Sequence, residues 1–115
     1  MIQVETLYIA GPMSGISGFN YPAFKRAQSL LHNHGYEVES PHVNGQGHAH
    51  REYEWYIKQG LKQLITCDGV ALLDGWEGSR GVRFELYVAR FLKMPCHPIQ
   101  YWLDRPRRKG ERPTS

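Results

Sequence analysis

A short apolar run, Val70-Ala71-Leu72-Leu73, restricts the fold of this chain more than any other stretch. The run has the length of a fully buried strand and carries an acid near each end, Asp68 and Asp74. A glycine-rich loop follows at residues 75–81, and an apolar pattern with helical spacing begins at Val82. A strand that delivers such a loop to a helix N-terminus is typical of open α/β sheets, which bind ligands there.

The rest of the chain repeats this alternation of strand and helix. The pattern predicts strands at 4–10, 36–39, 70–73 and 95–99, with helices at 20–34, 53–66 and 80–93. This order predicts a parallel sheet with right-handed crossovers. We expect a single three-layer α/β domain of the flavodoxin or Rossmann-like type, with strand order 2-1-3-4 and room for a fifth strand. The loops after strands 1 and 3 would then lie side by side.

Apolar spacing also predicts which helical positions are buried. Asn20 is a candidate N-cap for the first helix, and Gly35 is a candidate residue for its C-terminal end. In the second helix, Gly60 is expected to cost about 1 kcal/mol relative to Ala. The expected buried positions of these two helices are Phe24, Ala27, Leu30, Leu31, Trp55, Ile57, Leu61, Leu64 and Ile65.

Composition sets the class of protein. A chain of 115 residues suits one domain, and no apolar run approaches the ~20 residues needed to span a bilayer. The net charge is +3, yet five of the 14 basic residues lie between Arg105 and Arg112. We therefore predict a domain at residues 1–103 and a basic, flexible tail at 104–115, and we expect no nucleic-acid binding by the fold. Without a signal-peptide pattern, and with Cys67 and Cys96 expected as buried thiols, a cytoplasmic location is expected.

Two glycine-rich loops are candidate anion sites. Residues Gly11, Pro12, Met13, Ser14 and Gly15 follow the first strand, where backbone N–H groups could approach an anion. This loop has neither the Gly-Lys-Ser/Thr of a P-loop nor a dinucleotide fingerprint, and it could equally be a turn that needs glycine.

The second loop, Ser79, Arg80 and Gly81, offers a hydroxyl, a guanidinium and free N–H groups at a helix start. The alternative for this loop is a capping serine beside a solvated arginine.

Glu85 is the candidate for chemistry, because it lies about one turn into the helix that follows this loop. On strand geometry its partner should be Asp74, at the ligand end of the strand, whereas Asp68 lies at the opposite end. Tyr8 and Trp76 could stack on a base, although aromatic residues at such positions are more often part of the core or its rim.

A metal is not expected. His42, His48 and His50 have no further ligand at a metal-site spacing, and the alternative is a polar, solvated loop. No cofactor is expected either.

Four segments resemble the nucleoside 2-deoxyribosyltransferase superfamily. The resemblance is to its small DUF4406-type branch from bacteriophages and prophages, which is related to deoxynucleoside 5′-monophosphate N-hydrolases. It extends from residue 7 to about residue 99. The segments that carry it are Tyr8-Ile-Ala-Gly-Pro-Met-Ser-Gly15, Asn20-Tyr-Pro-Ala-Phe24, Cys67-Asp-Gly-Val-Ala-Leu-Leu-Asp-Gly-Trp76 and Ser79-Arg-Gly-Val-x-x-Glu-Leu86.

The resemblance implies roles for individual residues. Glu85 would be the nucleophile that attacks the anomeric carbon, Asp68 the acid that assists the leaving base, and Tyr8 a neighbour of the nucleophile. Ser79 stands where the hydrolase branch binds a 5′-phosphate and where the nucleoside transferases tend to carry an Asp. Strand geometry and the family pattern thus favour different second acids, Asp74 and Asp68.

The function predicted on this basis is cleavage, by hydrolysis or transfer, of the N-glycosidic bond of a (deoxy)nucleoside 5′-monophosphate or nucleoside. The alternative is a nucleotide-binding or sequestering module that has the same pocket and no turnover. The resemblance also implies a homo-oligomer of two or more copies, in which a neighbour helps to close the site.

Overall fold

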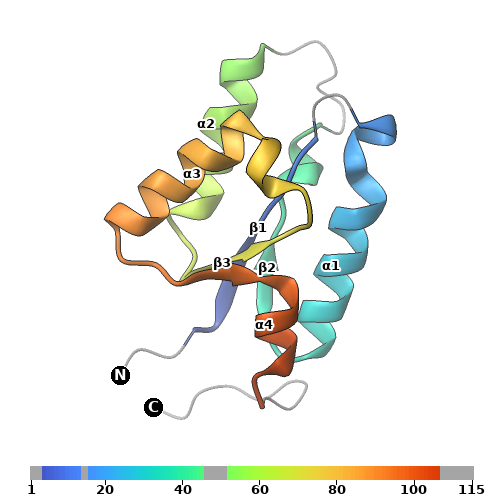
Figure 1. Cartoon of the computed structure of the whole chain (residues 1–115), viewed down its shortest axis with the longest axis vertical. Coiled ribbons are helices and arrows are strands. Elements are labelled where there is room, and N and C mark those ends of the chain that lie inside the picture. Colours follow the sequence, from blue (N-terminus) through green and yellow to red (C-terminus); the bar gives the residue numbers. More distant parts are fainter. Residues whose placement is uncertain (1–3, 14–15, 46–51, 107–115) are drawn as a thin grey trace.

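A computed structural model of the chain describes residues 4–13, 16–45 and 52–106. Within these ranges the fold is a four-stranded parallel sheet between two layers of helices (Figure 1). The strands are β1 (Thr6–Ala10), β2 (Glu37–Glu39), β3 (Gly69–Leu72) and β4 (Cys96–Pro98), in the order β2-β1-β3-β4. The predicted α/β class and strand order are confirmed, and the described residues contain no fifth strand.

In the described part of the chain, four α-helices connect and flank the strands. They are α1 (Tyr21–Asn33), α2 (Tyr53–Leu64), α3 (Arg80–Phe91) and α4 (Ile99–Asp104). The described loops contain the short 3₁₀ helices η1 (Ser17–Asn20), η2 (Pro41–Gly45) and η3 (Trp76–Gly78). No helix in the described part of the chain has both the length and the apolar character needed to cross a membrane.

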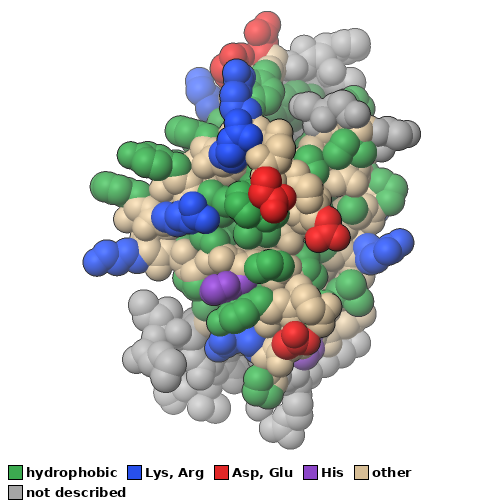
Figure 2. Space-filling model, in the orientation of Figure 1, with side chains coloured by type: hydrophobic (Ala, Val, Ile, Leu, Met, Phe, Trp, Pro, Cys, Tyr) green, Lys and Arg blue, Asp and Glu red, His purple; other side chains and the backbone are tan. Residues whose placement is uncertain are grey.

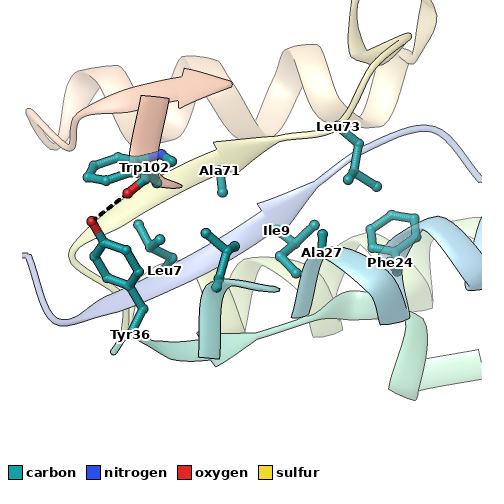
Figure 3. Packing of buried hydrophobic residues seen from close by; sticks show 9 residues of the cluster. Leu7, Ile9, Phe24, Ala27, Tyr36, Ala71, Leu73 and Trp102 are labelled. Carbon is teal, nitrogen blue, oxygen red and sulfur yellow. Dashed lines mark hydrogen bonds between the residues drawn. The ribbon is translucent and has the colours of Figure 1, made fainter. Parts of the chain in front are cut away.

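Side-chain alternation along β1 divides the core into two clusters, one on each face of the sheet. Leu7 and Ile9 point toward α1 and α4, whereas Tyr8 and Ala10 point toward α2 and α3. Figure 3 shows the first cluster, made of Leu7, Ile9, Phe24, Ala27, Leu31, Tyr36, Ala71, Leu73 and Trp102. The second contains Tyr8, Ala10, Leu64, Cys67, Val70, Leu72, Val82, Leu86 and Ala89.

Helix α4 was not predicted, and it closes the first cluster. Its Trp102 is fully buried, and the indole Nε1–H points to the carbonyl oxygens of Val70 at 2.9 Å and His97 at 3.2 Å. The hydroxyl of Tyr36 donates a 3.1 Å hydrogen bond to the Trp102 carbonyl (Figure 3). One side chain therefore ties α4 to both β3 and β4.

Asn20 occupies the predicted N-cap position of α1, but its backbone is left-handed (φ 64°) and its side chain makes no capping hydrogen bond. Its Nδ2 instead donates to the carbonyl of Pro12 at 3.0 Å. Other local predictions were wrong. Leu30 and Ile65 are exposed, because neither faces the sheet. His42 is buried, with its Nδ1 2.6 Å from the Ser40 hydroxyl, so this part of the loop is not solvated.

Topology positions the site. The chain adds β2 on one side of β1 and adds β3 and β4 on the other, so β1 and β3 flank the topological switch point. These two strands pair in parallel from Leu7 opposite Gly69 to Ala10 opposite Leu72. The carboxyl ends of both strands therefore open on the same edge of the sheet. The loop before α1 and the loop before α3 meet there.

Candidate active site

A pocket of about 640 Å³ opens where the loops after β1 and β3 meet the N-terminal halves of α2 and α3. Its walls combine backbone of both glycine-rich loops with a group of aromatic rings and one acid. The lining residues are Tyr8, Gly11, Pro12, Met13, Phe19, Tyr21, Pro41, Tyr53, Tyr56, Ile57, Gly78, Ser79, Arg80, Gly81, Val82 and Glu85.

Tyr8 and Glu85 meet at the inner wall of this pocket. Tyr8 comes from the middle of β1, and Glu85 from the second turn of α3, on the same buried face as Val82 and Leu86. The Tyr8 hydroxyl donates a 2.7 Å hydrogen bond to Oε2 of Glu85. Tyr8 is fully buried and Glu85 is only 8% exposed, so the pair sits in a largely dry environment.

Burial changes the protonation of both groups. Loss of hydration raises the pKa of Glu85 to about 7, against the smaller lowering effect of the Tyr8 hydrogen bond. Burial, followed by the adjacent Glu85 charge, holds the pKa of Tyr8 well above its ordinary value. Tyr8 therefore stays a hydrogen-bond donor, while Glu85 can exist as carboxylate or acid near neutral pH. A carboxyl group perturbed in this way inside a pocket is a candidate for chemistry.

The start of α3 forms the polar rim of the pocket. Ser79 caps the helix, since its Oγ accepts a 3.2 Å hydrogen bond from the Val82 N–H. The exposed guanidinium of Arg80 lies over the Tyr53 ring, 5.3 Å from its centroid. A Cβ on Gly81 would come within 3.0 Å of Ile57 Cδ1, so the glycine permits close approach of α2. Ser79 is therefore a helix cap, and all three residues of this loop line the pocket.

The first glycine-rich loop forms the opposite wall. Gly11, Pro12 and Met13 line the pocket, and Ser14 and Gly15 lie outside the described residues. A Cβ on Gly11 would come within 2.6 Å of Leu73 Cδ1, so this glycine lets the loop pack against the end of β3. The Asn20 amide on the Pro12 carbonyl holds the loop to the start of α1.

Three other predicted site residues are not brought to this pocket. Asp68 lies at the opposite end of the sheet, where its Oδ2 accepts 3.0 Å hydrogen bonds from the N–H groups of Glu5 and Thr6. Asp74 follows β3 at the ligand edge but is exposed and does not line the pocket. Trp76 packs on the second core cluster. Neither proposed second acid therefore lies beside Glu85.

Sequence reasoning missed the contribution of α2. Tyr53, Tyr56, Ile57 and Gly60 recur at helical spacing and form the stripe that faces α3 and the pocket. This periodicity was available in the sequence. Of these residues, only Ile57 is expected from the sequence at a buried position, and Gly60 is expected there only as a weak point of the helix.

The described side chains form no group of three His, Cys, Asp or Glu that could hold a metal ion. Of the three histidines considered for a metal, His48 and His50 lie outside the described residues. His42 packs beside Phe24 and Tyr21, and burial together with the Lys25 charge lowers its pKa. The pocket can thus supply a carboxyl group, hydroxyls, a guanidinium and aromatic faces.

Solved structures with this fold include two named transferases. The 2-deoxyribosyltransferase of the psychrotolerant bacterium Bacillus psychrosaccharolyticus is 22% identical, with a TM-score of 0.62 over 79% of this chain and 69% of that one. The 2-desoxiribosyltransferase of Leishmania mexicana is 17% identical, with a TM-score of 0.63 over 82% of this chain and 63% of that one. A conserved protein of Enterococcus faecalis is 20% identical, with a TM-score of 0.57 over 82% of this chain and 62% of that one. The chain spans less than two thirds of the latter two, and likeness at these identities concerns the fold.

No curated protein matches this chain. One family model does match, and it covers residues 5–97, from the start of β1 into β4. Tyr8, both glycine-rich loops and Glu85 all fall within that range. The chain therefore belongs to the family described as Domain of unknown function (DUF4406).

Proposed function

We propose that this protein cleaves the N-glycosidic bond of a deoxynucleoside 5′-monophosphate, with Glu85 as the nucleophile. One observation carries the proposal. A nearly buried carboxyl group forms the inner wall of the pocket, held at one oxygen by Tyr8, while its pKa is raised to about 7. The fold shared with two structures named as 2-deoxyribosyltransferases supports the same class of reaction.

The two carboxylate oxygens would have different tasks. Oε2 accepts the Tyr8 hydrogen bond, and Oε1 has no hydrogen-bond partner among the described residues. Oε1 would attack C1′ of the sugar, forming a C–O bond as the C1′–N bond breaks and the base leaves with the bonding electrons. A carboxylate suits this task because the transition state is oxocarbenium-like, and the glycosyl ester divides the reaction into two easier steps. Water, or a second base in transfer, would then release the sugar and restore the carboxylate.

The rim of the pocket favours a substrate with a phosphate. Arg80 and Glu85 are five residues apart on α3, a rise of about 7.5 Å along the axis. That span suits a sugar with C1′ at Glu85 and its 5′-phosphate at the helix start. There, Arg80 and the N–H groups of Gly81 and its neighbours would meet the anion.

The base would lie among aromatic rings. Phe19, Tyr21 and Tyr56 line the remaining part of the pocket and can stack on a planar heterocycle. The departing base also needs a proton. Since no second acid lies beside Glu85 among the described side chains, and Tyr8 keeps its proton, we propose that solvent supplies it.

Product analysis tests the proposal directly. Deoxynucleoside monophosphates, ribonucleoside monophosphates and free nucleosides are each incubated with the protein, and released base is measured by chromatography. We expect base release from a deoxynucleoside monophosphate, with a loss of at least about 10³-fold in Glu85→Gln. Full activity in Glu85→Gln, with a folded control by circular dichroism, would contradict the mechanism.

A nucleotide-binding module without turnover is the second candidate. The observation that favours it is the position of Asp68, which is bonded to backbone at the far end of β3 and is not in the pocket. Calorimetry on the same nucleotide panel distinguishes the two functions. Saturable binding without any free base would favour sequestration.

We also propose that the protein forms homo-oligomers through α3. Phe84, Tyr87 and Phe91 recur at helical spacing on its outer face and are 48%, 70% and 78% exposed. Figure 2 shows hydrophobic side chains projecting from the side of the molecule where α3 lies in Figure 1. Light scattering on wild type and Tyr87→Glu tests this. A wild-type monomer at micromolar concentration would contradict it.

A further inference from the structure

Helix α2 meets the Tyr8–Glu85 pair at a glycine. Gly60 is buried in the second half of the helix and does not itself line the pocket. A Cβ at this position would lie 2.7 Å from Glu85 Oε2 and 2.8 Å from the Tyr8 hydroxyl oxygen. Real Cβ atoms do not approach other atoms so closely, so the two oxygens occupy the space that a side chain would need.

The helix itself does not require this glycine. Gly60 has ordinary helical backbone angles, whereas the positive-φ glycines of the described chain are Gly18, Gly35 and Gly75. Glycine is the poorest helix former after proline, so alanine would suit α2 better on propensity alone. The neighbours, and not the backbone, exclude a side chain here.

We infer that Gly60 is a positioning residue for Glu85, because its missing side chain lets the α2 backbone close over Oε2 and the Tyr8 hydroxyl. This inference rests on the proposed function and adds a third member to the Tyr8–Glu85 pair. The close helix backbone shields Oε2 from water and leaves Tyr8 as its hydrogen-bond donor. Oε1 is then the oxygen left for the substrate.

The two contacts differ in how easily they can yield. Tyr8 is fully buried in the second core cluster, so its ring is held in place. Oε2 is the far end of a flexible side chain, and its carboxyl group can rotate away from α2. A Cβ at residue 60 should therefore displace Glu85 and leave the fold intact.

The test is Gly60→Ala, with Lys58→Ala as the matched control on the exposed side of the same helix. In Gly60→Ala we expect kcat for base release to fall about 10- to 100-fold with KM little changed, since displacement of a reacting group by about 1 Å has effects of this size. In Lys58→Ala both constants should stay at their wild-type values. An unchanged kcat in Gly60→Ala overturns the inference.

A second readout does not depend on activity. Carbon-13 NMR titration of labelled glutamate follows Glu85 directly in wild type and in Gly60→Ala. A carboxyl group that rotates out of its dry position regains water, so we expect its pKa to fall by about one unit or more from its value of about 7. An unchanged titration overturns the role of Gly60 even if no substrate is turned over. Conversely, a shifted titration without base release supports Gly60 and contradicts the proposed function.

Loss of folding in Gly60→Ala is resolved by a triple variant. Tyr8→Phe and Glu85→Ala together remove both oxygens that a Cβ would meet. If the fold of Gly60→Ala is lost and then restored in this background, the pair is what excludes the side chain, as inferred. A triple variant that remains unfolded overturns the inference, because something other than the pair would exclude the side chain.

Discussion

The hydroxyl of Tyr8 lies 2.7 Å from Oε2 of Glu85, although the two residues are 77 positions apart in the chain. The contact joins the middle of β1 to the second turn of α3, across the sheet face that α2 covers. It gives a charged group one strong donor in a place where water is scarce. Four measurements follow from this relationship and from the residues around it.

The rate of base release should rise with pH. Nucleophilic Glu85 must be ionised, and burial raises its pKa to about 7, so kcat/KM should increase toward that pH and level off above it. Tyr8→Phe removes the hydrogen bond that lowers this pKa, so the rising limb should move to higher pH. A phosphate monoester has its own pKa of about 6. Wild type and Tyr8→Phe are therefore compared on the same substrate, so that ionisation of the substrate affects both profiles equally. A limb at the same pH in Tyr8→Phe would argue against this role for Tyr8.

Stability should depend on pH in the opposite sense. The folded state keeps the Glu85 proton up to about pH 7, whereas the unfolded chain releases it near 4.5. The free energy of unfolding therefore decreases as pH rises through this window, by about 3 kcal/mol in total. Glu85→Gln has no such loss. In urea unfolding, the stability of Glu85→Gln relative to wild type should increase between pH 4.5 and 8. A stability difference that does not change with pH would contradict the raised pKa of Glu85.

Arg80→Ala should discriminate nucleotides from nucleosides. Loss of a charge-assisted contact to phosphate is expected to raise KM for the monophosphate about tenfold and to leave that of the nucleoside unchanged. Arg83→Ala is the matched control, because Arg83 lies on the same helix, bonds to the Glu77 carbonyl and does not line the pocket. Equal effects of Arg80→Ala on both substrates would place the phosphate elsewhere.

Asp68→Ala should lower stability without changing catalysis. Its carboxylate accepts hydrogen bonds from the N–H groups of Glu5 and Thr6 at the start of β1, and removal of the carboxylate breaks both of these part-buried bonds. The expected cost is about 1–3 kcal/mol in urea unfolding. Steady-state kinetics, measured well below the unfolding midpoint, should match wild type. A large fall in kcat would restore the role of second acid that family resemblance suggested.

The sheet and its order follow from the sequence because their signals are local. The apolar runs of β1 and β3, and the helical spacing of Phe24, Ala27 and Leu31, each occur within a few residues. Helix α4 gives a weaker signal: it has six residues and follows Pro98 directly. What stabilises it is Trp102 on Val70, and a contact 32 positions away cannot be recognised from local spacing.

The site was predictable in part for the same reason. Glu85, Ser79 and Arg80 lie on one continuous segment, so helical geometry brings them to one pocket. Gly60 was interpreted only as a weak point of α2, since its function is the space it leaves for two residues from other elements. Asp68 shows the reverse: strand direction placed it at the far end of the sheet, and the structure agrees.

The separation of Tyr8 and Glu85 has a consequence for folding. Their hydrogen bond can form only after β1 has paired in parallel with β3, a step that closes a loop of some sixty residues (Leu7 to Gly69). Such long-range pairing is slow relative to helix formation. In a nascent or partly folded chain, Glu85 is therefore exposed to water, and the pKa of its carboxyl group is that of an ordinary glutamate. The perturbed carboxyl group is a property of the completed domain, so its titration can report when folding has finished.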